Sequence, residues 1–447
     1  MNKYESYKDS GVRWIGLIPE HWECIRLKYL IKEPLKYGAN EAADDDNPDN
    51  PRYIRITDFG ADGDLKNDTF KSLPEDKAND YLLEEGDLLF ARSGATVGKT
   101  FLFKNYDGRA CFAGYLIKAS FKKEKINSSY IDYVTRSNYY DNWKQSIFQQ
   151  ATIQNIGADK YNLLKIPIPK DLKEQNAIAA YLDQKTTEID QLISKKERLI
   201  KLLEEEKMAV INQAVTQGLN RDVPMKDSGV DWLGEIPEHW DRIRIKNLVT
   251  TPVCDGPHET PNWVDEGVPF ISAEAIKGNE IDFNYKRGYI SREQHLEYEK
   301  KSKVEFGDIL FCKSGSTTGK SAMVKTTNEF GIWSPLAILR ADENRIVKDY
   351  LFYVLQSKFF RTQVVNNWTF GTQPNIGMKA LENLWVTIPP LSEQQELVNY
   401  MKYQIFSTQE LIDKIKKEIN YLKEYKTALI SNVVTGKVDV RDEVMVN

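Results

Sequence analysis

The stretch KDSGVRWIGLIPEHW at residues 8–22 returns as KDSGVDWLGEIPEHW at residues 226–240. The second copy begins 218 positions after the first, which is about half of the 447-residue chain. Two tryptophans and a Pro-Glu-His-Trp group in the same register do not recur by chance, and self-similarity at a fixed spacing indicates a repeated structural unit. The sequence therefore predicts a tandem duplication, in which both halves share one fold and perform related tasks.

The repeat continues well beyond this opening motif. GDLLF at residues 86–90 matches GDILF at residues 307–311, and SGATVGK at 93–99 matches SGSTTGK at 314–320. Shorter matches follow in the same order, namely Thr152 with Thr372, Asn155-Ile156-Gly157 with Asn375-Ile376-Gly377, Ile168-Pro169 with Ile388-Pro389, and Glu174-Gln175 with Glu393-Gln394. The spacing drifts only between 218 and 221 positions, so the two halves differ by few insertions.

The composition indicates a folded protein of the cytosol. Hydrophobic residues make up 41% of the chain, which is ample for packed cores, and a length of 447 residues predicts two to four domains. The sequence has no apolar run of about 18 residues and no apolar secretory core near its start, so we expect no membrane span. The four cysteines stand singly, which fits reduced, buried thiols rather than a disulfide framework.

The charge distribution supports nucleic-acid binding only weakly. A formal net charge of −5 counts against a simple binder of polyanions. Residues 92–125 are basic, because they hold eight Lys and Arg side chains against only Asp107 and Glu124. A basic stretch on an acidic chain is compatible with contacts to nucleic acid, and the alternative is an ordinary solvated surface.

Each half divides into a mixed first part and a helical second part. Short β-rich runs such as residues 53–56 and 87–90 alternate with Gly, Asn, Asp and Pro turns. An aromatic helical stretch follows at residues 130–148 and again at 350–368. After the Ile-Pro pair the sequence reads as one long helix, since Pro followed by Glu-Gln is a typical helix start. The predicted segments are a first domain at 1–170, a helix at 171–217, a second domain at 218–389, and a second helix with its tail at 390–447.

The two predicted long helices carry apolar residues in the 4-3 spacing of a coiled coil. The stripe of the first helix consists of Leu182, Ile189, Ile193, Ile200, Leu203 and Val210. The stripe of the second consists of Met401, Ile405, Ile412, Ile415, Ile419, Leu422 and Leu429. A helix of roughly 60 Å, at about 1.5 Å per residue, cannot bury such a stripe alone, and its own repeat is the obvious partner. The predicted fold is therefore α+β, with two mixed domains and an antiparallel coiled coil. The alternative is that each helix packs on its own domain.

Gly98-Lys99-Thr100 and Gly319-Lys320-Ser321 resemble the end of a phosphate-binding loop. The full motif requires a glycine where this chain has Ser93 and Ser314, and it requires a helix after the lysine. The residues after Lys99 favour a strand instead. The sequence therefore predicts a β-hairpin with a basic tip and excludes a nucleotide site of this class.

The other candidate catalytic and metal-binding groups are incomplete. Asp49 and the Glu75-Asp76-Lys77 group could hold a metal as in a nuclease, but the second half has no match for Pro48-Asp49. Cys254 and His258 lack further ligands at the spacing that zinc requires. The histidines of the repeated motif stand between Pro and Trp, and we expect them to pack at the start of each domain. The sequence thus predicts neither catalysis nor a metal site in this chain.

Taken together, these motifs resemble the specificity subunits of type I restriction-modification systems. The resemblance rests on the DSGVxWxGxIPxHW motif at Asp9–Trp22 and Asp227–Trp240, on the two hairpin blocks, and on the Ile-Pro and Glu-Gln lead into each long helix. It covers essentially the whole chain. It implies two target-recognition domains, each reading one half of an asymmetric, bipartite DNA sequence, and a coiled coil that fixes the spacer between the halves.

The resemblance also implies partners. Double-stranded DNA would be the target, and two methyltransferase subunits, which bind S-adenosylmethionine and methylate adenine, would dock on the coiled coil. Restriction subunits would add translocation and cleavage, with ATP and magnesium bound to these partners. The chain itself would then be non-catalytic and would hold no cofactor. Two other classes stay open, an unrecognised enzyme and a coiled-coil protein scaffold without sequence-specific DNA binding.

The residues expected to contact DNA lie in two places in each half. In the first half they are Arg92, Ser93, Thr96 and Lys99 of the hairpin, with Gln149, Gln150 and Thr152 after the aromatic helix. In the second half they are Lys313, Ser314, Thr317 and Lys320, with Asn367, Thr372 and Gln373. Lys and Arg contacts to phosphates would supply affinity, and the residues named here would contact phosphates or base edges; the alternative is that they stabilise turns. Because the segments between the matched blocks differ between the halves, the two half-sites should differ as well.

Overall fold

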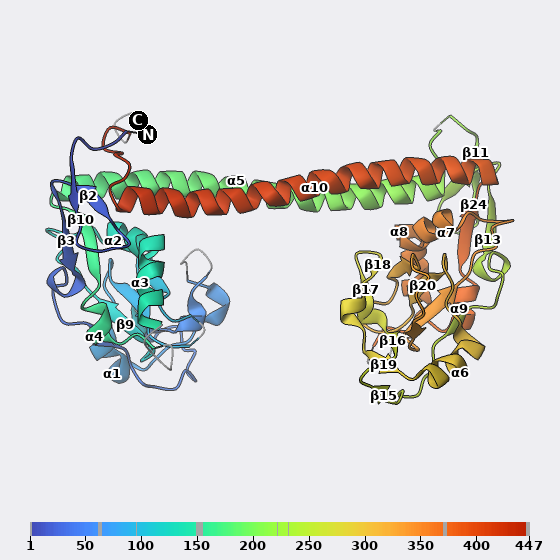
Figure 1. The fold of residues 1–447 in the computed structure, drawn as a ribbon, viewed down its shortest axis with the longest axis horizontal. Helices are drawn as coiled ribbons and strands as arrows, with labels where there is room; N and C mark the ends of the chain where they lie inside the picture. Colours follow the sequence, from blue (N-terminus) through green and yellow to red (C-terminus); the bar gives the residue numbers. More distant parts are fainter. Residues whose placement is uncertain are drawn as a thin grey trace. The chain divides into compact units, whose positions relative to one another are not determined.

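The computed structural model of the protein describes residues 2–60, 65–94, 96–148, 155–220, 222–230, 232–369 and 373–443. The chain divides into two compact units. Unit 1 comprises Met1–Lys196 and Lys416–Asn447, and unit 2 comprises Glu197–Ile415. Each unit therefore holds one α+β domain, the beginning of the long helix that follows this domain, and the end of the other long helix (Figure 1).

Unit 1 is built around an antiparallel four-stranded sheet in the order β4–β9–β6–β7. Its strands are β4 Lys36–Tyr37, β6 Leu88–Ala91, β7 Thr100–Leu102 and β9 Leu116–Ala119. The further strand pairs are β1 Tyr7–Asp9 with β2 Leu17–Pro19, β3 Trp22–Arg26 with β10 Lys165–Pro169, and β5 Arg52–Ile54 in parallel with β8 Ala110–Phe112. The helices are α1 Glu75–Ala78, α2 Ser128–Thr135, α3 Asn138–Phe148, α4 Ala158–Tyr161 and the first part of α5 Leu172–Gln217. The predicted aromatic stretch is thus two helices, which meet at Ser137.

Unit 2 repeats this plan, with the sheet order β14–β23–β20–β21. Its strands are β14 Cys254–Asp255, β20 Ile309–Cys312, β21 Ser321–Met323 and β23 Leu336–Leu339. A second sheet holds β15 Trp263–Val264, β19 Gly288–Ile290, β16 Val268–Ile271 and β22 Gly331–Ile332. The further pairs are β11 Met225–Asp227 with β12 Glu235–Pro237, β13 Asp241–Arg244 with β24 Trp385–Ile388, and β17 Ile276–Lys277 with β18 Glu280–Ile281. The helices are α6 Arg292–Ser302, α7 Lys348–Gln356, α8 Lys358–Asn367, α9 Met378–Glu382 and the first part of α10 Leu391–Val434.

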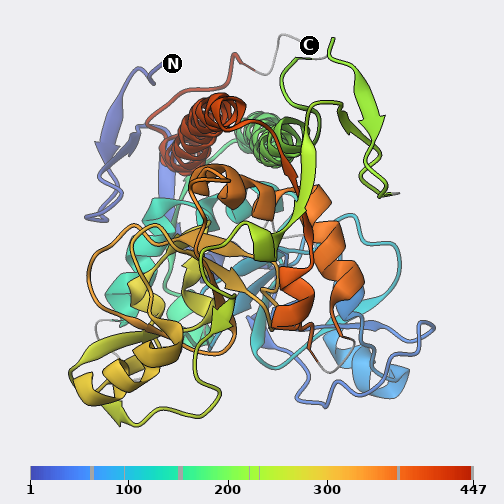
Figure 2. The ribbon, with the colours of Figure 1, turned by 90° about the vertical axis from the view of Figure 1, so that its right-hand side faces the viewer.

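The long helices α5 and α10 pack side by side within each unit, as both views show (Figures 1 and 2). In unit 1, Asp190 accepts from Lys426 Nζ at 2.6 Å, and Lys196 Nζ donates to Glu418 at 2.6 Å. Residue numbers rise along one helix as they fall along the other, so the pair is antiparallel. In unit 2, Lys207 Nζ donates to Gln409 Oε1 at 2.8 Å. The prediction of paired long helices is confirmed.

The predicted stripe accounts for most of the buried face of this helix pair. Its partly exposed members are Ile200, Val210, Ile405 and Leu422, and its other apolar members are buried. The alternative prediction also holds in part, because the first turns of α5 pack on their own domain. There, Tyr133 Oη donates to Asp183 Oδ1 at 2.6 Å. Within the described residues, neither long helix nor any shorter one has a stretch apolar enough to cross a membrane.

The repeated Pro-Glu-His-Trp group binds the first turn of the long helix in each unit. Trp22 Nε1 donates to Glu174 Oε1 at 2.9 Å, and His21 Nε2 lies 2.8 Å from Glu174 Oε2. Unit 2 repeats these contacts, which join Trp240 and His239 to Glu393 at 3.1 and 2.8 Å. The expectation that the motif histidines pack at the start of each domain is therefore confirmed, since each imidazole is hydrogen-bonded to one carboxylate of the scaffold.

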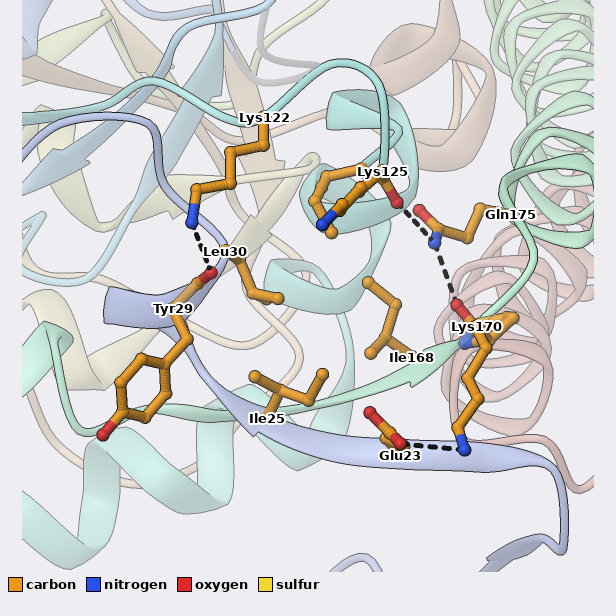
Figure 3. Close-up of a pocket in the computed structure, with 11 residues that line it drawn as sticks. Glu23, Ile25, Tyr29, Leu30, Lys122, Lys125, Ile168, Lys170 and Gln175 are labelled. Carbon is orange, nitrogen blue, oxygen red and sulfur yellow. Dashed lines mark hydrogen bonds and ion pairs between the residues drawn. The ribbon is translucent and has the colours of Figure 1, made fainter.

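The next residue of each long helix, Gln175 or Gln394, ties the helix to the domain. Gln175 Nε2 donates to the carbonyls of Lys125 and Pro169 at 3.0 and 2.9 Å, and its Oε1 accepts from Asn127 N (Figure 3). Gln394 makes the same three contacts in unit 2, with Arg345 O, Pro389 O and Val347 N. Each glutamine thus satisfies backbone groups that would otherwise be buried without partners.

The end of the other long helix completes this joint in each unit. Tyr130 Oη donates to Val434 O at 3.2 Å in unit 1, and the hydroxyl of Thr387 donates to Val215 O in unit 2. The helices then end at Gly436 and Gly218, which have φ values of 70° and 72°. A left-handed residue after the last helical turn is a common helix end, and it favours glycine. Each domain is therefore fixed to the start of one helix and to the end of the other.

A cavity of about 370 Å³ adjoins this joint in unit 1 (Figure 3). Ile25, Leu30 and Ile168 are among its apolar lining, and Lys122 and Lys170 are among its cations. Both lysines already have partners, because Lys170 pairs with the Glu23 carboxylate at 2.9 Å and Lys122 donates to the Tyr29 carbonyl. In the matched stretch of unit 2, Asp342 and Pro390 replace these two lysines. These two lysines are thus found in unit 1 alone, and they cannot serve a function that both repeats perform with the same residues.

The four cysteines are free thiols. Cys111 and Cys312 are buried, and burial raises the pKa of each thiol to about 12. Cys24 and Cys254 are only partly buried, so the expectation of burial holds for two of the four. Because the thiolate is the reactive form, the two buried cysteines should be inert at neutral pH.

Candidate nucleic-acid interface

The predicted hairpin of the first half lies between β6 and β7 of unit 1. Leu88 pairs with Leu102 and Phe90 with Thr100, and the turn between them is closed by Gly98 N donating to Ala91 O at 2.7 Å. Gly98 has a φ of 79°, which disfavours other residues at this position. Because β7 follows Lys99, the prediction of a β-hairpin at this place is confirmed.

The hairpin between β20 and β21 of unit 2 has the same backbone. Gly319 N donates to Cys312 O at 2.8 Å, and Gly319 has a φ of 92°. Within the turn, Lys320 N donates to Thr317 O at 3.0 Å, just as Lys99 N donates to Thr96 O at 2.9 Å in unit 1. The segments 92–99, without Ala95, and 313–320 therefore share these backbone hydrogen bonds, and they are called the reading turns below after the role proposed for them.

The segment after the aromatic helices closes over each reading turn. Ser93 forms a backbone bridge with Asn155 in unit 1, and Ser314 forms one with Asn375 in unit 2. Gly315 N also donates to Pro374 O at 3.0 Å. In each unit, the structure therefore places an asparagine that follows the second group of candidates, Asn155 or Asn375, beside the turn.

The described candidates of the second part differ in exposure. Gln373 is exposed, whereas Asn367 Nδ2 donates to Gln363 O at 2.9 Å within its own helix. Four of the predicted contact residues, namely Gln149, Gln150, Thr152 and Thr372, lie outside the described residues. In the reading turns, Ser93, Thr96, Ser314 and Thr317 are partly exposed, so their hydroxyls are within reach of a ligand. Their role in contacting DNA stays a prediction.

The four cations of the reading turns fall into two classes. Lys99 and Lys320 are exposed at equivalent positions, and neither forms an ion pair with a carboxylate among the described residues. Arg92 and Lys313 are the first residues of the two turns, and each contacts a side chain of the sheet. The guanidinium of Arg92 lies 4.9 Å from the centroid of the Tyr37 ring, and Lys313 Nζ lies 3.2 Å from Asp255 Oδ2. The exposed lysines are therefore free to meet an anionic ligand.

Asp255 is a buried carboxylate in unit 2 that binds three side chains, of which Lys313 is buried and the other two are exposed. Besides Lys313, it binds Lys301 Nζ at 2.7 Å and His258 Nε2 at 3.0 Å. Burial alone would raise the pKa of this carboxyl, but the hydrogen bonds from Lys301 and Lys313 outweigh it and lower the pKa. Asp255 is therefore ionised at neutral pH, and its share of the folding stability would be lost only in acid.

The wider basic stretch of the first half is partly neutralised. Arg109 pairs with Glu75 at 2.5 Å, and Lys118 lies 3.3 Å from Glu33. Glu75 and its neighbours thus serve as ion-pair partners. Among the described residues, moreover, no cluster of three or more His, Cys, Asp or Glu side chains could hold a metal ion. Of the basic stretch at residues 92–125, Arg109 and Lys118 are thus the weakest candidates for contacts to an anionic ligand.

Sequence reasoning missed the residues beneath the turns. Tyr37 and Asp255 occupy the same place in the two sheets, since Tyr37 pairs with Ile117 of β9 and Asp255 with Ala337 of β23. The 218-position spacing of the repeat places Tyr37 opposite Asp255 and Gly38 opposite Gly256, so the equivalence could be found in the sequence. The contacts with Arg92 and Lys313 could not, because each cation lies more than fifty positions later.

Comparison with known proteins agrees with this duplicated architecture. The model of the family "Type I restriction modification DNA specificity domain" matches residues 19–202 and again residues 237–421. The specificity subunit of type I restriction enzyme MjaVIII from Methanocaldococcus jannaschii is 23% identical over 98% of this chain and 97% of its own length. The EcoKI specificity subunit from Escherichia coli is 27% identical over 66% of this chain and 61% of its own length.

Solved structures share the fold. A chain from a study titled "Structural basis underlying complex assembly and conformational transition of the type I R-M system" aligns with a TM-score of 0.71 and 17% identity, covering 94% of this chain and 99% of that one. The HsdS subunit from Thermoanaerobacter tengcongensis aligns with a TM-score of 0.55 and 18% identity, covering 94% and 98%. Since the family model covers both repeats, this chain belongs to the type I restriction modification DNA specificity family, and it is a specificity subunit whose partner subunits hold the catalytic activities.

Proposed function

We propose that each domain reads one half of an asymmetric, bipartite DNA sequence through its reading turn. One observation carries this proposal: the two turns share a backbone shape, while the side chains beneath and beside them differ. A shared backbone suits two equivalent encounters with a duplex, and different side chains suit two different half-sites. The domains that we propose to act in this way are residues 1–170 and 218–389.

Within this scheme, Lys99 and Lys320 contact phosphates. Both are exposed, and neither is paired to a described carboxylate. Contacts of this kind supply affinity and position the protein without carrying sequence information. The neighbouring hydroxyls of Thr96 and Thr317 and the amide of Gln373 are candidates for base edges in the major groove, where each base pair has a distinct pattern of donors and acceptors.

The long helices, at residues 171–217 and 390–447, form the second functional surface. We propose that they set the spacer between the half-sites and dock two methyltransferase subunits, with which any restriction subunits assemble. S-adenosylmethionine, ATP and magnesium are bound by these partner subunits. Exposed aromatic side chains on α10 support this role, among them Tyr403, Phe406 and Tyr421. Aromatic residues are enriched at protein–protein interfaces.

The net charge of −5 has a consequence for this scheme. The Glu- and Lys-rich faces of the helices serve protein partners, so that the chain as a whole does not attract DNA. We expect the isolated subunit to bind DNA weakly and the assembled complex to bind it tightly. Tight, sequence-specific binding by the purified chain alone would contradict this expectation.

Single-molecule methylome sequencing tests the proposal. DNA from cells that express this chain with its methyltransferase subunit is compared with DNA from cells that lack the chain. The expected result is a bipartite motif with modified adenine on both sides of a fixed gap, present only with the chain. An unchanged methylome despite confirmed assembly would reject the proposal and favour a protein scaffold without DNA recognition.

A further inference from the structure

The cation that begins each reading turn is held by a side chain from the same place in the sheet. Arg92 follows β6 directly, and Lys313 follows β20. The residue beneath each is the last of a short edge strand, Tyr37 of β4 or Asp255 of β14. The position is thus repeated, whereas the chemistry is not: one anchor is an aromatic ring and the other a carboxylate.

The anchor in unit 1 leaves the cation with unused donors. The Arg92 guanidinium lies 4.9 Å from the centroid of the Tyr37 ring, a contact with the ring face that spends no N–H group. Arg92 Nε is buried and has no acceptor among the described residues. The Tyr37 hydroxyl accepts from Ala158 N at 3.0 Å, directly after the segment that closes the turn. Tyr37 therefore contacts both Arg92, at the start of the turn, and the backbone of Ala158.

The anchor in unit 2 engages the charged group of its cation in an ion pair. Lys313 is only 8% exposed, and its ammonium lies 3.2 Å from Asp255 Oδ2. Its backbone is held as well, since Lys313 N donates to Pro335 O and Lys313 O accepts from Ile376 N. Lys301 and His258 bind the same carboxylate and fix it from the other side. An ammonium in this arrangement would have to give up a buried ion pair in order to turn toward DNA.

From these contacts we infer that Tyr37 and Asp255 are positioning residues that set the direction of the two reading turns, and that only the first anchor presents its cation to DNA. This inference rests on the proposed reading of DNA by the turns. The partly exposed Arg92 contacts the duplex with the terminal N–H groups of its guanidinium, since its Nε is buried. Lys313 acts through the turn, whose contacts with DNA come from Thr317 and Lys320.

Exchanging the anchors between the units tests this inference in the full chain, assembled with its methyltransferase subunits. The variants are Asp255→Tyr, Lys313→Arg, and both together, which places the pair of unit 1 into unit 2. Asp255→Tyr should lower methylation of the motif about tenfold, because the buried Lys313 ammonium loses its carboxylate, and Lys313→Arg alone should lower it less, because the charge pair is kept. Each single change acts through the turn of unit 2. It should also relax the sequence preference in one half-site only. The double variant should recover most of the loss.

A matched control is Glu280→Gln, which removes the carboxylate from an exposed ion pair with Lys325 in the same unit. This variant should methylate like the parent chain. Thermal unfolding by circular dichroism separates positioning from loss of the fold, and the preference in the unchanged half-site serves as an internal check. Asp255→Asn, which keeps the size of the side chain, provides a second variant if Asp255→Tyr does not fold.

The outcomes distinguish the inference from the function on which it rests. A preference relaxed equally in both half-sites, or a folded double variant without recovery, would overturn the inference. So would single variants that methylate with the parent's motif and rate. If the parent chain itself directs no bipartite methylation, the proposed function fails instead, and the anchors are then structural contacts only.

Discussion

The two repeats match closely at the joint that starts each long helix, but they differ in the anchor residue beneath each reading turn. At the joint, the residues are the same in both units: a Trp and a His bind one Glu, and the following Gln binds three backbone groups. Beneath the turn, the backbone is the same but the side chains are not, since Tyr37 in unit 1 corresponds to Asp255 in unit 2.

This difference separates what holds the domain from what the domain does. The joint fixes a domain to two helices, a task that is identical in both units and therefore keeps identical residues. The reading turn needs a constant backbone, which its glycines provide, but the proposed half-sites differ. Residues around the turn can therefore diverge as long as some side chain holds the cation, and a ring face does so in unit 1 and a carboxylate in unit 2.

The most disruptive change to the joint is Gly436→Ala. Gly436 has a φ of 70°, and an added Cβ would meet the ring of Pro19 and the indole of Trp22. Left-handed backbone and overpacking together should cost about 2–4 kcal/mol of unfolding free energy. Gly218→Ala should cost less, because its Cβ would lie 3.2 Å from Trp240. Urea unfolding of both variants measures this order, and a larger loss for Gly218→Ala would show that the two joints are not packed as described.

Removing the carboxylate at the joint should have the next largest effect. Glu174→Ala leaves the buried indole N–H of Trp22 without an acceptor, which should cost about 2–3 kcal/mol. Glu393→Ala should cost about half as much, because the Glu393 side chain is 28% exposed against 7% for Glu174. Glu174→Gln keeps an acceptor and should recover part of the loss. Differential scanning calorimetry of the three variants checks this ranking, which equal losses at Glu174 and Glu393 would refute.

The sequence predicted the elements of the fold better than it predicted the partners of single side chains. The heptads placed Leu182 and Met401 in a buried stripe, because a 4-3 spacing reports one face of a helix directly. The hairpins followed from the strand after Lys99. The tie between His21 and Glu174 joins residues 153 positions apart, and no local pattern encodes such a contact. Likewise, a lysine in a turn is ordinarily exposed, and only the strand pairing of β14 reveals that Lys313 is buried against Asp255.

In the reading turns, we expect the largest loss of DNA binding from Arg92→Ala. It should weaken binding of the assembled complex by about 1–3 kcal/mol and relax the preference in one half-site, as expected for a contact to a base edge. Lys320→Ala should instead weaken binding uniformly across sequences and reduce the slope of binding against salt concentration by about one. Base-resolved footprinting at several salt concentrations separates these effects. Uniform weakening by Arg92→Ala would place Arg92 at a phosphate, and no change would remove it from the interface.

The helix pair offers the finest comparison, because equivalent lysines have different partners. Lys426 Nζ lies 2.6 Å from a carboxylate oxygen of Asp190, whereas Lys207 Nζ donates to the neutral Gln409 Oε1 at 2.8 Å. A partly exposed ion pair is worth about 0.5–1 kcal/mol and is screened by salt, whereas the bond to an amide is not. Asp190→Gln gives unit 1 the amide partner of unit 2, so it should lower stability slightly at low salt and not at 1 M salt. Gln409→Asp should do the reverse. Equal effects at both salt concentrations would mean that the charge of Asp190 contributes nothing, and that either side chain serves the antiparallel pair through hydrogen bonding and packing alone.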